Sequence, residues 1–435
     1  CTMTRDEKYE LFIKDDIENN RGRLVDCCDE LNYLLSHPEA NMILGKYFLN
    51  DILTYATTFS PFYKQYHEFK SLVDFPVVDK QFLKEHWDEI AVLEYQGLPD
   101  NRVKFTSGST GTPFKMVMDR YKHCRWIAGN KVFRSNVGVR SHEKTLYFSG
   151  NVSDKKIPVE RQDRDNVYYI NRAQIDDSVL LDVVMMLQTD EYKTLTAMAS
   201  ILEKIAHFID DGKAPVWNGN MSAIFSVSEH LKENVRRVIM DYFGCPVYVL
   251  YANEENGVLA VEDGTSDGCR ANEVDFYFEV LSMNSDEPAK EGELGRLVIT
   301  DLFNKAFPVI RYENGDLVSL HRNSEGKLYF DQIAGRKIDT LYTTDGRMVH
   351  YFEGISFLEQ YMDIRQFQLI QYDYDHFKWV LNTDNHSYED MIIQESKAVF
   401  GKNSKWEFEY VDELPKLRSG KVKMTVCLIP GLNEI

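Results

Sequence analysis

The segment Thr106-Ser-Gly-Ser-Thr-Gly-Thr-Pro113 limits the fold of this chain more than any other. Short apolar runs, Val103 to Phe105 and Phe114 to Met118, stand on either side of it, so we predict a strand, a loop and a second strand. The two glycines let backbone N–H groups approach a phosphate closely, and the hydroxyl side chains add hydrogen bonds. No Gly-Lys-Ser/Thr sequence closes the loop, so it is not a Walker loop. On its own, the loop fits phosphate binding and a flexible Ser/Gly hairpin equally well.

The rest of the chain predicts alternating helices and strands. Residues 1–100 are typical of helices, and the apolar residues of 197–209 recur with helical spacing on one face. A second helix is predicted from about Ser228 to Phe243, followed by an apolar strand from Val247 to Tyr251. A helix followed by an apolar strand indicates an α/β layer.

From residue 274 onward the pattern changes to short strands separated by Gly and Asn turns, which indicates antiparallel β structure. The tail predicts strands near 366–382, a helix near 387–400 and a strand near 405–411. We therefore predict an α/β fold, in which a large N-terminal domain of αβ layers with a small antiparallel β region precedes a small α+β C-terminal domain. Length alone suggests two or three domains. We place the domain boundary between residues 1–336 and residues 337–435, where the tail begins.

The charge of the chain restricts its partners. The net charge is −19, and a field of that sign repels nucleic acid and anionic membranes, so we expect neither as a partner. An anionic nucleotide would also be repelled unless basic groups or a metal lie at its site. The seven cysteines are an odd number and lack Cys-x-x-Cys spacing, which argues against a disulfide framework and a zinc site. With a polar N-terminus and no apolar leader, we expect a cytoplasmic protein, with a homodimer as the default assembly.

Four further motifs could carry chemistry, although each also has an ordinary structural interpretation. Tyr251-Ala-Asn-Glu-Glu255 follows a predicted strand, where ligands of α/β sheets gather, but an acidic surface turn is the simpler interpretation. Arg311-Tyr-Glu-Asn-Gly-Asp316 predicts a tight turn, and its last carboxylate could accept two ribose hydroxyls. Arg336, after Gly335, and Lys421, on the loop that begins at Leu414, could bind phosphate or be exposed cations.

The order and spacing of these motifs resemble those of the adenylate-forming superfamily, which contains acyl-CoA synthetases, luciferases and the adenylation domains of peptide synthetases. The matches are with its phosphate loop (106–113), its Tyr-Gly-x-Thr-Glu element (251–255), its core β segment (292–300 and 311–316), the start of its hinge (335–336) and its C-terminal lysine loop (419–421). Two stretches, Ser60 to Tyr63 and Asp74 to Lys80, make the chain most similar to phenylacetate–CoA ligases and related capsule-biosynthesis proteins. The resemblance covers residues 50–425.

The resemblance implies a ligase that uses ATP to convert a small carboxylic acid into an acyl-adenylate, releases pyrophosphate, and then transfers the acyl group to CoA. Magnesium would accompany the ATP, with Glu255 as its ligand, and Lys421 and Arg336 would be catalytic. The implied ATP-binding residues are Thr106, Ser107, Gly108, Ser109, Thr110, Gly111, Ser228, Glu229, Tyr251, Ala252, Asn253, Glu254, Asp316 and Arg336.

The chain departs from the family pattern near these residues. Ala252 replaces a glycine, Glu254 replaces Thr or Ser, and Ile338 stands where the family usually has an acidic hinge residue. Adjacent Glu254 and Glu255 would crowd like charge beside a polyphosphate unless a metal is present. Lys423 is a near alternative to Lys421. Two other functions stay open: adenylation with transfer to an amine or hydroxyl in surface-polysaccharide biosynthesis, and nucleotide binding without catalysis.

Overall fold

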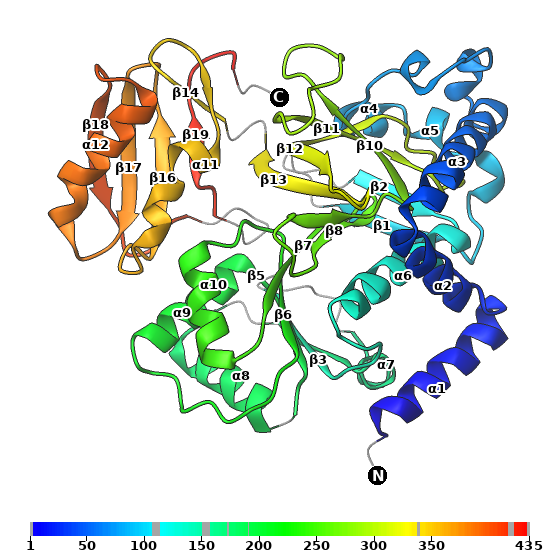
Figure 1. The fold of residues 1–435 in the computed structure, drawn as a ribbon, viewed down its shortest axis with the longest axis horizontal. Helices are drawn as coiled ribbons and strands as arrows, with labels where there is room; N and C mark the ends of the chain where they lie inside the picture. Colours follow the sequence, from blue (N-terminus) through cyan, green and yellow to red (C-terminus); the bar gives the residue numbers. More distant parts are fainter. Residues whose placement is uncertain are drawn as a thin grey trace. The chain divides into compact units, whose positions relative to one another are not determined.

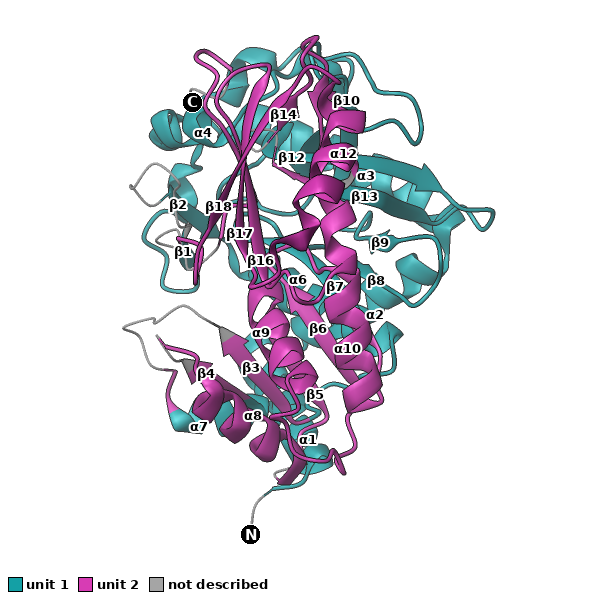
Figure 2. Cartoon of the chain, turned by 90° about the vertical axis from the view of Figure 1, so that its left-hand side faces the viewer, with its two compact units in different colours: residues 1–143, 159–167, 248–333 teal, residues 144–158, 168–247, 334–435 magenta. Residues whose placement is uncertain are grey.

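The computed structural model describes residues 3–106, 114–149, 157–171, 174–189, 191–336, 340–415 and 422–432 (Figure 1). The chain divides into two compact units, which Figure 2 colours separately. Unit 1 contains residues 1–143, 159–167 and 248–333, and unit 2 contains residues 144–158, 168–247 and 334–435.

The N-terminal part of unit 1 is helical, as predicted for residues 1–100. Local sequence signals begin several of these helices: Thr4 and Glu7 form a capping box, Pro38 occupies a first turn, and the Asp119 carboxylate accepts the Lys122 N–H. The helices are α1 (Arg5–Asp15), α2 (Arg23–Ser36), α3 (Pro38–Phe59), α4 (Lys80–Glu85), α5 (Trp87–Ile90), α6 (Arg120–Asn136) and α7 (Val159–Asp165).

The strands of unit 1 confirm the two strands predicted on either side of residues 107–113, and the predicted antiparallel region. In the first pair, β1 (Arg102–Thr106) runs antiparallel to β2 (Phe114–Met118) with Thr106 opposite Phe114. The larger sheet has the order β10-β11-β12-β13-β9-β8-β7. Its strands are β7 (Val247–Asn253), β8 (Gly257–Glu262), β9 (Cys269–Ala271), β10 (Phe276–Leu281), β11 (Gly295–Asp301), β12 (Tyr312–Arg322) and β13 (Leu328–Arg336).

A buried aromatic core joins the β1–β2 pair to the segment before α4. Phe75, Phe114 and Phe307 are at most 1% exposed and belong to one apolar cluster with Tyr312. Backbone hydrogen bonds then fix Val78 beside the start of β12: the Val78 N–H donates to the Arg311 carbonyl at 3.0 Å. The chain that leads into α4 is therefore anchored to the strand that carries Asp316.

Unit 2 contains an α/β layer and the C-terminal region. Its layer has the strand order β6-β5-β3-β4, with β3 parallel to β5 and β5 parallel to β6. The elements are β3 (Thr145–Ser149), β4 (Val167–Asn171), α8 (Asp177–Thr189), β5 (Thr194–Met198), α9 (Ala199–Asp210), β6 (Ala223–Val227) and α10 (Glu233–Phe243).

The C-terminal region has a core of its own, centred on Trp379, Phe377 and Phe400, which are fully buried. A four-stranded sheet of order β18-β17-β16-β19 and the helix α12 make up most of it, so the predicted α/β fold with a small α+β C-terminal part is confirmed. The elements are β14 (Leu341–Tyr342), β15 (Met348–Val349), α11 (Tyr351–Gly354), β16 (Gln366–Gln371), β17 (His376–Asn382), α12 (Glu389–Phe400), β18 (Lys405–Tyr410) and β19 (Thr425–Cys427).

The two units do not follow the predicted boundary at residue 336, because residues 334–435 cluster with the α/β layer of unit 2. Ion pairs join the two parts: Lys204–Glu413 at 3.8 Å, Arg365–Asp211 at 3.4 Å and His230–Glu359 at 2.9 Å. The boundary between residues 336 and 337 stays a prediction.

The helix predicted from Ser228 begins later, at Glu233. Ser228 has a φ of +72°, in the left-handed region, and so cannot continue a right-handed helix. The Lys232 side chain at the N-cap position makes no capping hydrogen bond; the Glu233 N–H donates instead to the Glu359 carboxylate at 3.2 Å, from a distant part of the chain. The start of α10 is thus fixed by a long-range contact.

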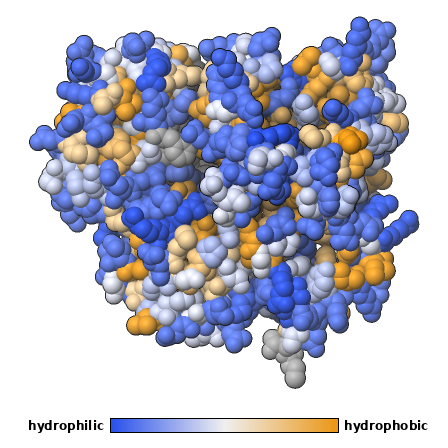
Figure 3. Space-filling model, viewed as in Figure 1, coloured by the Kyte–Doolittle hydropathy of each residue, from blue (hydrophilic) through white to orange (hydrophobic). Residues whose placement is uncertain are grey.

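The face of the molecule in Figure 3 is mostly hydrophilic, with apolar side chains scattered between charged ones, as the composition requires. Among the helices of the described ranges, none combines the length and the apolar composition needed to cross a membrane.

Candidate functional site

Tyr251 lies near the end of β7, where the pairing with β8 becomes irregular. Tyr251 pairs with Ala260, but the next residue, Ala252, pairs with Val258, so β8 carries an extra residue there. Such a bulge redirects the side chains beside it. The Tyr251 ring packs edge-on against Phe330 of β13, with ring centroids 5.7 Å apart. This contact holds the ring in one orientation.

Asp316 lies inside β12 rather than after a tight turn, so the turn predicted for Arg311 to Asp316 is wrong. Pairing with β11 stops after Glu313, which faces Val298, and resumes at Leu317, which faces Arg296. The three residues between form a bulge, and Gly315 supplies the positive φ of +88° that it needs. The sequence Asn-Gly-Asp is suited to a turn and to a bulge. Only the strand pairing with β11 before and after these residues shows which of the two is formed.

Tyr251 and Asp316 meet in a hydrogen-bonded group. The Tyr251 hydroxyl donates to the Asp316 carboxylate, and the Asn314 amide donates to both, at 3.0 Å and 2.8 Å. The Asn314 carbonyl oxygen in turn accepts the Asp316 N–H at 3.0 Å. Asn314 therefore orients the carboxylate that was predicted to bind ribose, and the motif prediction did not single it out.

Glu254 and Glu255, in the turn between β7 and β8, each contact a lysine. The Lys104 ammonium lies 3.1 Å from the Glu254 carboxylate, and the Lys80 ammonium lies 2.9 Å from the Glu255 carboxylate. The like charge of the two carboxylates, for which we expected a metal, is thus balanced within the chain. Lys80 comes from α4 and Lys104 from β1, and nothing in their local sequence predicts these partners.

The donor set of this turn fits magnesium. Carboxylate oxygens are ligands that Mg²⁺ prefers, and Mg²⁺ is often held by one or two carboxylates together with substrate phosphates. Glu255, whose side chain is 7% exposed, would hold it, with Glu254 beside it. Among the described residues no larger group of His, Cys, Asp and Glu forms a metal site.

The other predicted residues are in different places. Thr106 ends β1, while Ser107 to Gly111 and Lys421 lie outside the described residues, as does the side chain of Thr106. In unit 2, Ser228 and Glu229 follow β6, and the Glu229 carboxylate accepts the Ser200 N–H at 2.9 Å, at the start of α9. Arg336 ends β13 with an exposed side chain. The contacts of Glu229 are those of a helix cap, and its role in binding stays a prediction.

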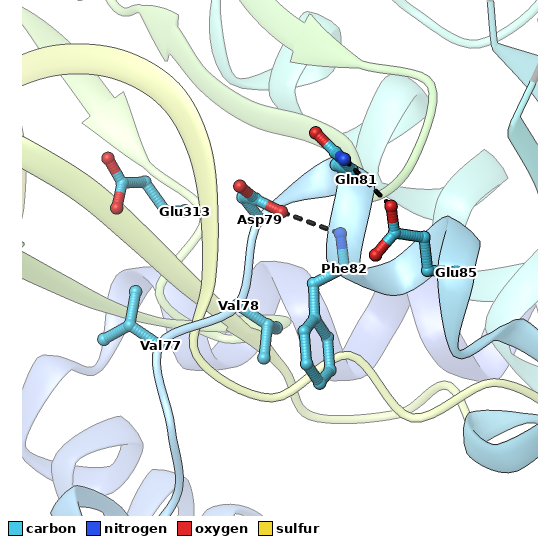
Figure 4. Close-up of a pocket in the computed structure, with 7 residues that line it drawn as sticks. All are labelled: Val77, Val78, Asp79, Gln81, Phe82, Glu85 and Glu313. Atoms are coloured by element: carbon cyan, nitrogen blue, oxygen red, sulfur yellow. Dashed lines mark hydrogen bonds between the residues drawn. The ribbon is translucent and has the colours of Figure 1, made fainter. Parts of the chain in front are cut away.

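An open hollow of about 320 Å³ lies beside the segment that leads into α4 (Figure 4). Glu313 stands on one side of it, and Gln81 and Glu85 stand on the other. Its remaining lining comes from Val77, Val78, Asp79 and Phe82. Asp79 accepts the Phe82 N–H at 2.8 Å and so caps α4. Three carboxylates make this hollow unsuitable for a polyphosphate.

Comparison with known proteins identifies similar proteins for the C-terminal region and for a larger part of the chain. Residues 341–427 match the family model described as the CapK C-terminal domain. A larger part of the chain is similar to Protein CapK of Staphylococcus aureus, with 25% identity over 369 residues, which cover 81% of this chain and 79% of that protein. Phenylacetate-coenzyme A ligase of Escherichia coli K12 is 37% identical over 78 residues, 18% of each chain.

Solved structures share the fold at low identity. A 2-hydroxyisobutyryl-CoA ligase in complex with 2-HIB-AMP superimposes with a TM-score of 0.70 and 18% identity, over 88% of this chain and 89% of that one. The anthranilate CoA ligase AuaEII in complex with anthranoyl-AMP gives a TM-score of 0.55 and 15% identity, over 74% and 65% of the two chains. The predicted resemblance is therefore confirmed: this chain has the fold of the adenylate-forming acyl-CoA ligases, with relatives in both the capsule and the phenylacetate–CoA ligase branches.

Proposed function

We propose that this chain activates a small carboxylic acid with ATP and then forms a CoA thioester. A carboxylate oxygen attacks the α-phosphorus of ATP, the bond from that phosphorus to the β-phosphate oxygen breaks, and pyrophosphate leaves. In the second step the CoA thiolate attacks the acyl carbon and AMP leaves. The observation that carries the proposal is the joining of Tyr251, Asn314 and Asp316 in a chain with this fold.

The side chains of that group supply positioning rather than covalent chemistry. A carboxylate held by Asn314 and Tyr251 is preorganised to accept ribose hydroxyls, which reduces the entropy lost when nucleotide binds. Magnesium, held by Glu255, would supply charge neutralisation at the phosphates. Arg336 is proposed to bind the ribose or a phosphate, and Lys421 is proposed to stabilise negative charge at the α-phosphate. Positioning and charge stabilisation are the main contributions in transfer at phosphorus.

Carboxylate-dependent exchange of pyrophosphate into ATP tests the first step. With a panel of aryl and acyl acids, at least one acid should support exchange, and Lys421→Ala should abolish it. Asp316→Ala should raise the concentration of ATP needed for half-maximal exchange. Asp267→Ala is a matched control, because the Asp267 carboxylate likewise accepts an asparagine amide, from Asn323 at 2.9 Å. If ATP binds but no acid supports exchange, the chain is a nucleotide-binding module.

Transfer to an amine or a hydroxyl group is the second candidate. It is favoured by the similarity to Protein CapK over 81% of this chain and by the match of residues 341–427 to the CapK C-terminal domain. Formation of a CoA ester with the acid that supports exchange selects the first function. Release of AMP that requires an amino or hydroxyl compound, with CoA inert, selects the second.

A further inference from the structure

Two lysine–glutamate pairs occupy consecutive positions of the β7–β8 turn, and they differ in burial. Glu255 is 7% exposed while its partner Lys80 is 35% exposed. Glu254 is 60% exposed while its partner Lys104 is 23% exposed. A buried carboxylate is costly without a cation, whereas an exposed carboxylate such as Glu254 can exchange its partner for water. Glu255 therefore needs a cation at all times, and Lys104 can leave Glu254 at small cost.

The surroundings of Lys104 concentrate positive charge in an otherwise acidic chain. Its ammonium group lies 3.5 Å from the centre of the Trp126 ring, and desolvation lowers the pKa of Lys104. Nearby, His123 has its pKa lowered to about 4 by burial and then by the charges of Arg102 and Lys104. Burial is the main cause of this shift, and the charges of Arg102 and Lys104 add to it, which places two cations close together at β1. Such a pair of cations is what an anionic ligand of this chain requires.

Two polar donors at the same turn have no acceptor within the described ranges. The Asn256 side chain is fully buried, and its amide nitrogen has no hydrogen-bond partner among the described residues. The same is true of the Trp126 indole nitrogen, which lies against the backbone of Gly257. Buried donors are rarely left unpaired. These two donors are therefore polar groups of the turn that no described residue satisfies.

We propose that Lys80 and Lys104 are phosphate-binding residues of the nucleoside triphosphate site, held in the free chain by Glu255 and Glu254. This inference rests on the function proposed above and assigns two residues to its phosphate contacts. When the triphosphate binds, the two ammonium groups exchange a carboxylate for phosphate oxygens, which carry more charge and accept more hydrogen bonds. Lysine suits this exchange because its ammonium is a point charge on a flexible stem.

The exchange also explains why a divalent cation would accompany the nucleotide. Once Lys80 turns to phosphate, the buried Glu255 carboxylate loses its counter-ion, and magnesium is the replacement. Lys80 and magnesium are therefore alternative partners of Glu255. It follows that removing the charge of Glu255 should release Lys80 for phosphate even without metal.

Calorimetric titration of the full chain with ATP in EDTA tests this consequence. Glu255→Gln, which keeps the shape of the side chain, should bind ATP more tightly than the unchanged chain, by about threefold or more, because Lys80 is released. The double variant Lys80→Met with Glu255→Gln should lose that gain. In the presence of Mg²⁺, which takes the place of Lys80 at Glu255, Lys80→Met and Lys104→Met should each weaken ATP binding by about tenfold, the effect of one charge-assisted hydrogen bond of about 1.4 kcal/mol.

Adenosine, which has no phosphate, is the control ligand, and its affinity should not change in any of these variants. Lys378→Met is the matched control variant, since the Lys378 ammonium lies 2.7 Å from the Glu409 carboxylate in the C-terminal sheet. If Glu255→Gln binds metal-free ATP no better than the unchanged chain, the exchange is wrong. If the lysine variants bind ATP normally in the presence of Mg²⁺, neither lysine is a phosphate ligand. If the unchanged chain binds neither ATP nor adenosine, the proposed function itself fails.

Discussion

Replacing Asn314 by alanine tests whether the carboxylate of Asp316 must be oriented to bind nucleotide. The Asn314 side chain makes three hydrogen bonds, two of them with Asp316 and one with the Tyr251 hydroxyl. Hydrogen bonds contribute about 0.5–1.5 kcal/mol each and somewhat more when one partner is charged. Because Asn314 is half-buried, water can replace some of the hydrogen bonds that its side chain makes. We expect Asn314→Ala to lower the free energy of unfolding by about 2 kcal/mol.

Asn314→Ala should also weaken nucleotide binding, and this effect can be measured separately from the loss of stability. Without Asn314 the carboxylate keeps only the Tyr251 hydroxyl of this group and samples other rotamers, so one hydrogen bond to ribose is lost on average. A loss of about 1.4 kcal/mol raises the Kd for AMP about tenfold. AMP is the suitable probe because it contains the ribose but lacks the β- and γ-phosphates. Isothermal titration gives the Kd, and urea unfolding gives the stability.

Asn323→Ala is a closely matched control. The Asn323 amide donates to the Asp267 carboxylate at 2.9 Å, and its carbonyl oxygen accepts the N–H groups of Glu325 at 3.1 Å and Lys327 at 3.0 Å. Asn323→Ala loses the same number of hydrogen bonds as Asn314→Ala, so the free energy of unfolding should fall by a similar amount. The affinity for AMP should stay unchanged. Normal AMP binding by Asn314→Ala would refute the positioning role. Equal weakening by both variants would show a general effect of lost stability.

Three further substitutions test the fold around the site. Lys122→Met should cost about 3–5 kcal/mol in urea unfolding, because it leaves the Asp301 carboxylate, 0% exposed and 2.6 Å from the Lys122 ammonium, without a counter-ion. Adding Asp301→Asn should recover part of the loss, and a double variant no more stable than the single one contradicts this. Gly257→Ala should cost about 1–3 kcal/mol, since its Cβ would stand 2.5 Å from Trp126 Cδ1 at a φ of +110°, and unchanged thermal unfolding would exclude the clash. Burial lowers the pKa of His142 from 6.5 to about 3, so the unfolded chain binds the extra proton in that range and stability falls on acidification. His142→Asn should reduce the slope of unfolding free energy against pH between 6.5 and 3, and an equal slope in both proteins would contradict the assignment.

The sequence alone determined the elements whose signals are local. Helical spacing in 197–209, the apolar strand after Phe243 and the strand runs on either side of residues 107–113 were all confirmed by the structure. These patterns work because the period of apolar residues decides which face of an element can be buried. The order of the motifs likewise predicted the resemblance to the adenylate-forming superfamily, and solved ligase structures share the fold of this chain.

Tertiary structure decided which of these residues meet. Tyr251 and Asp316 are 65 positions apart, and Lys104 and Glu254 are 150 apart, so no local pattern can pair them. Asn-Gly-Asp suits a turn and a bulge equally, and the β11–β12 register selected the bulge. The start of α10 moved to Glu233 because its cap comes from Glu359. Local sequence sets the conformations available to each segment, whereas register and side-chain packing between distant segments select the one that is adopted.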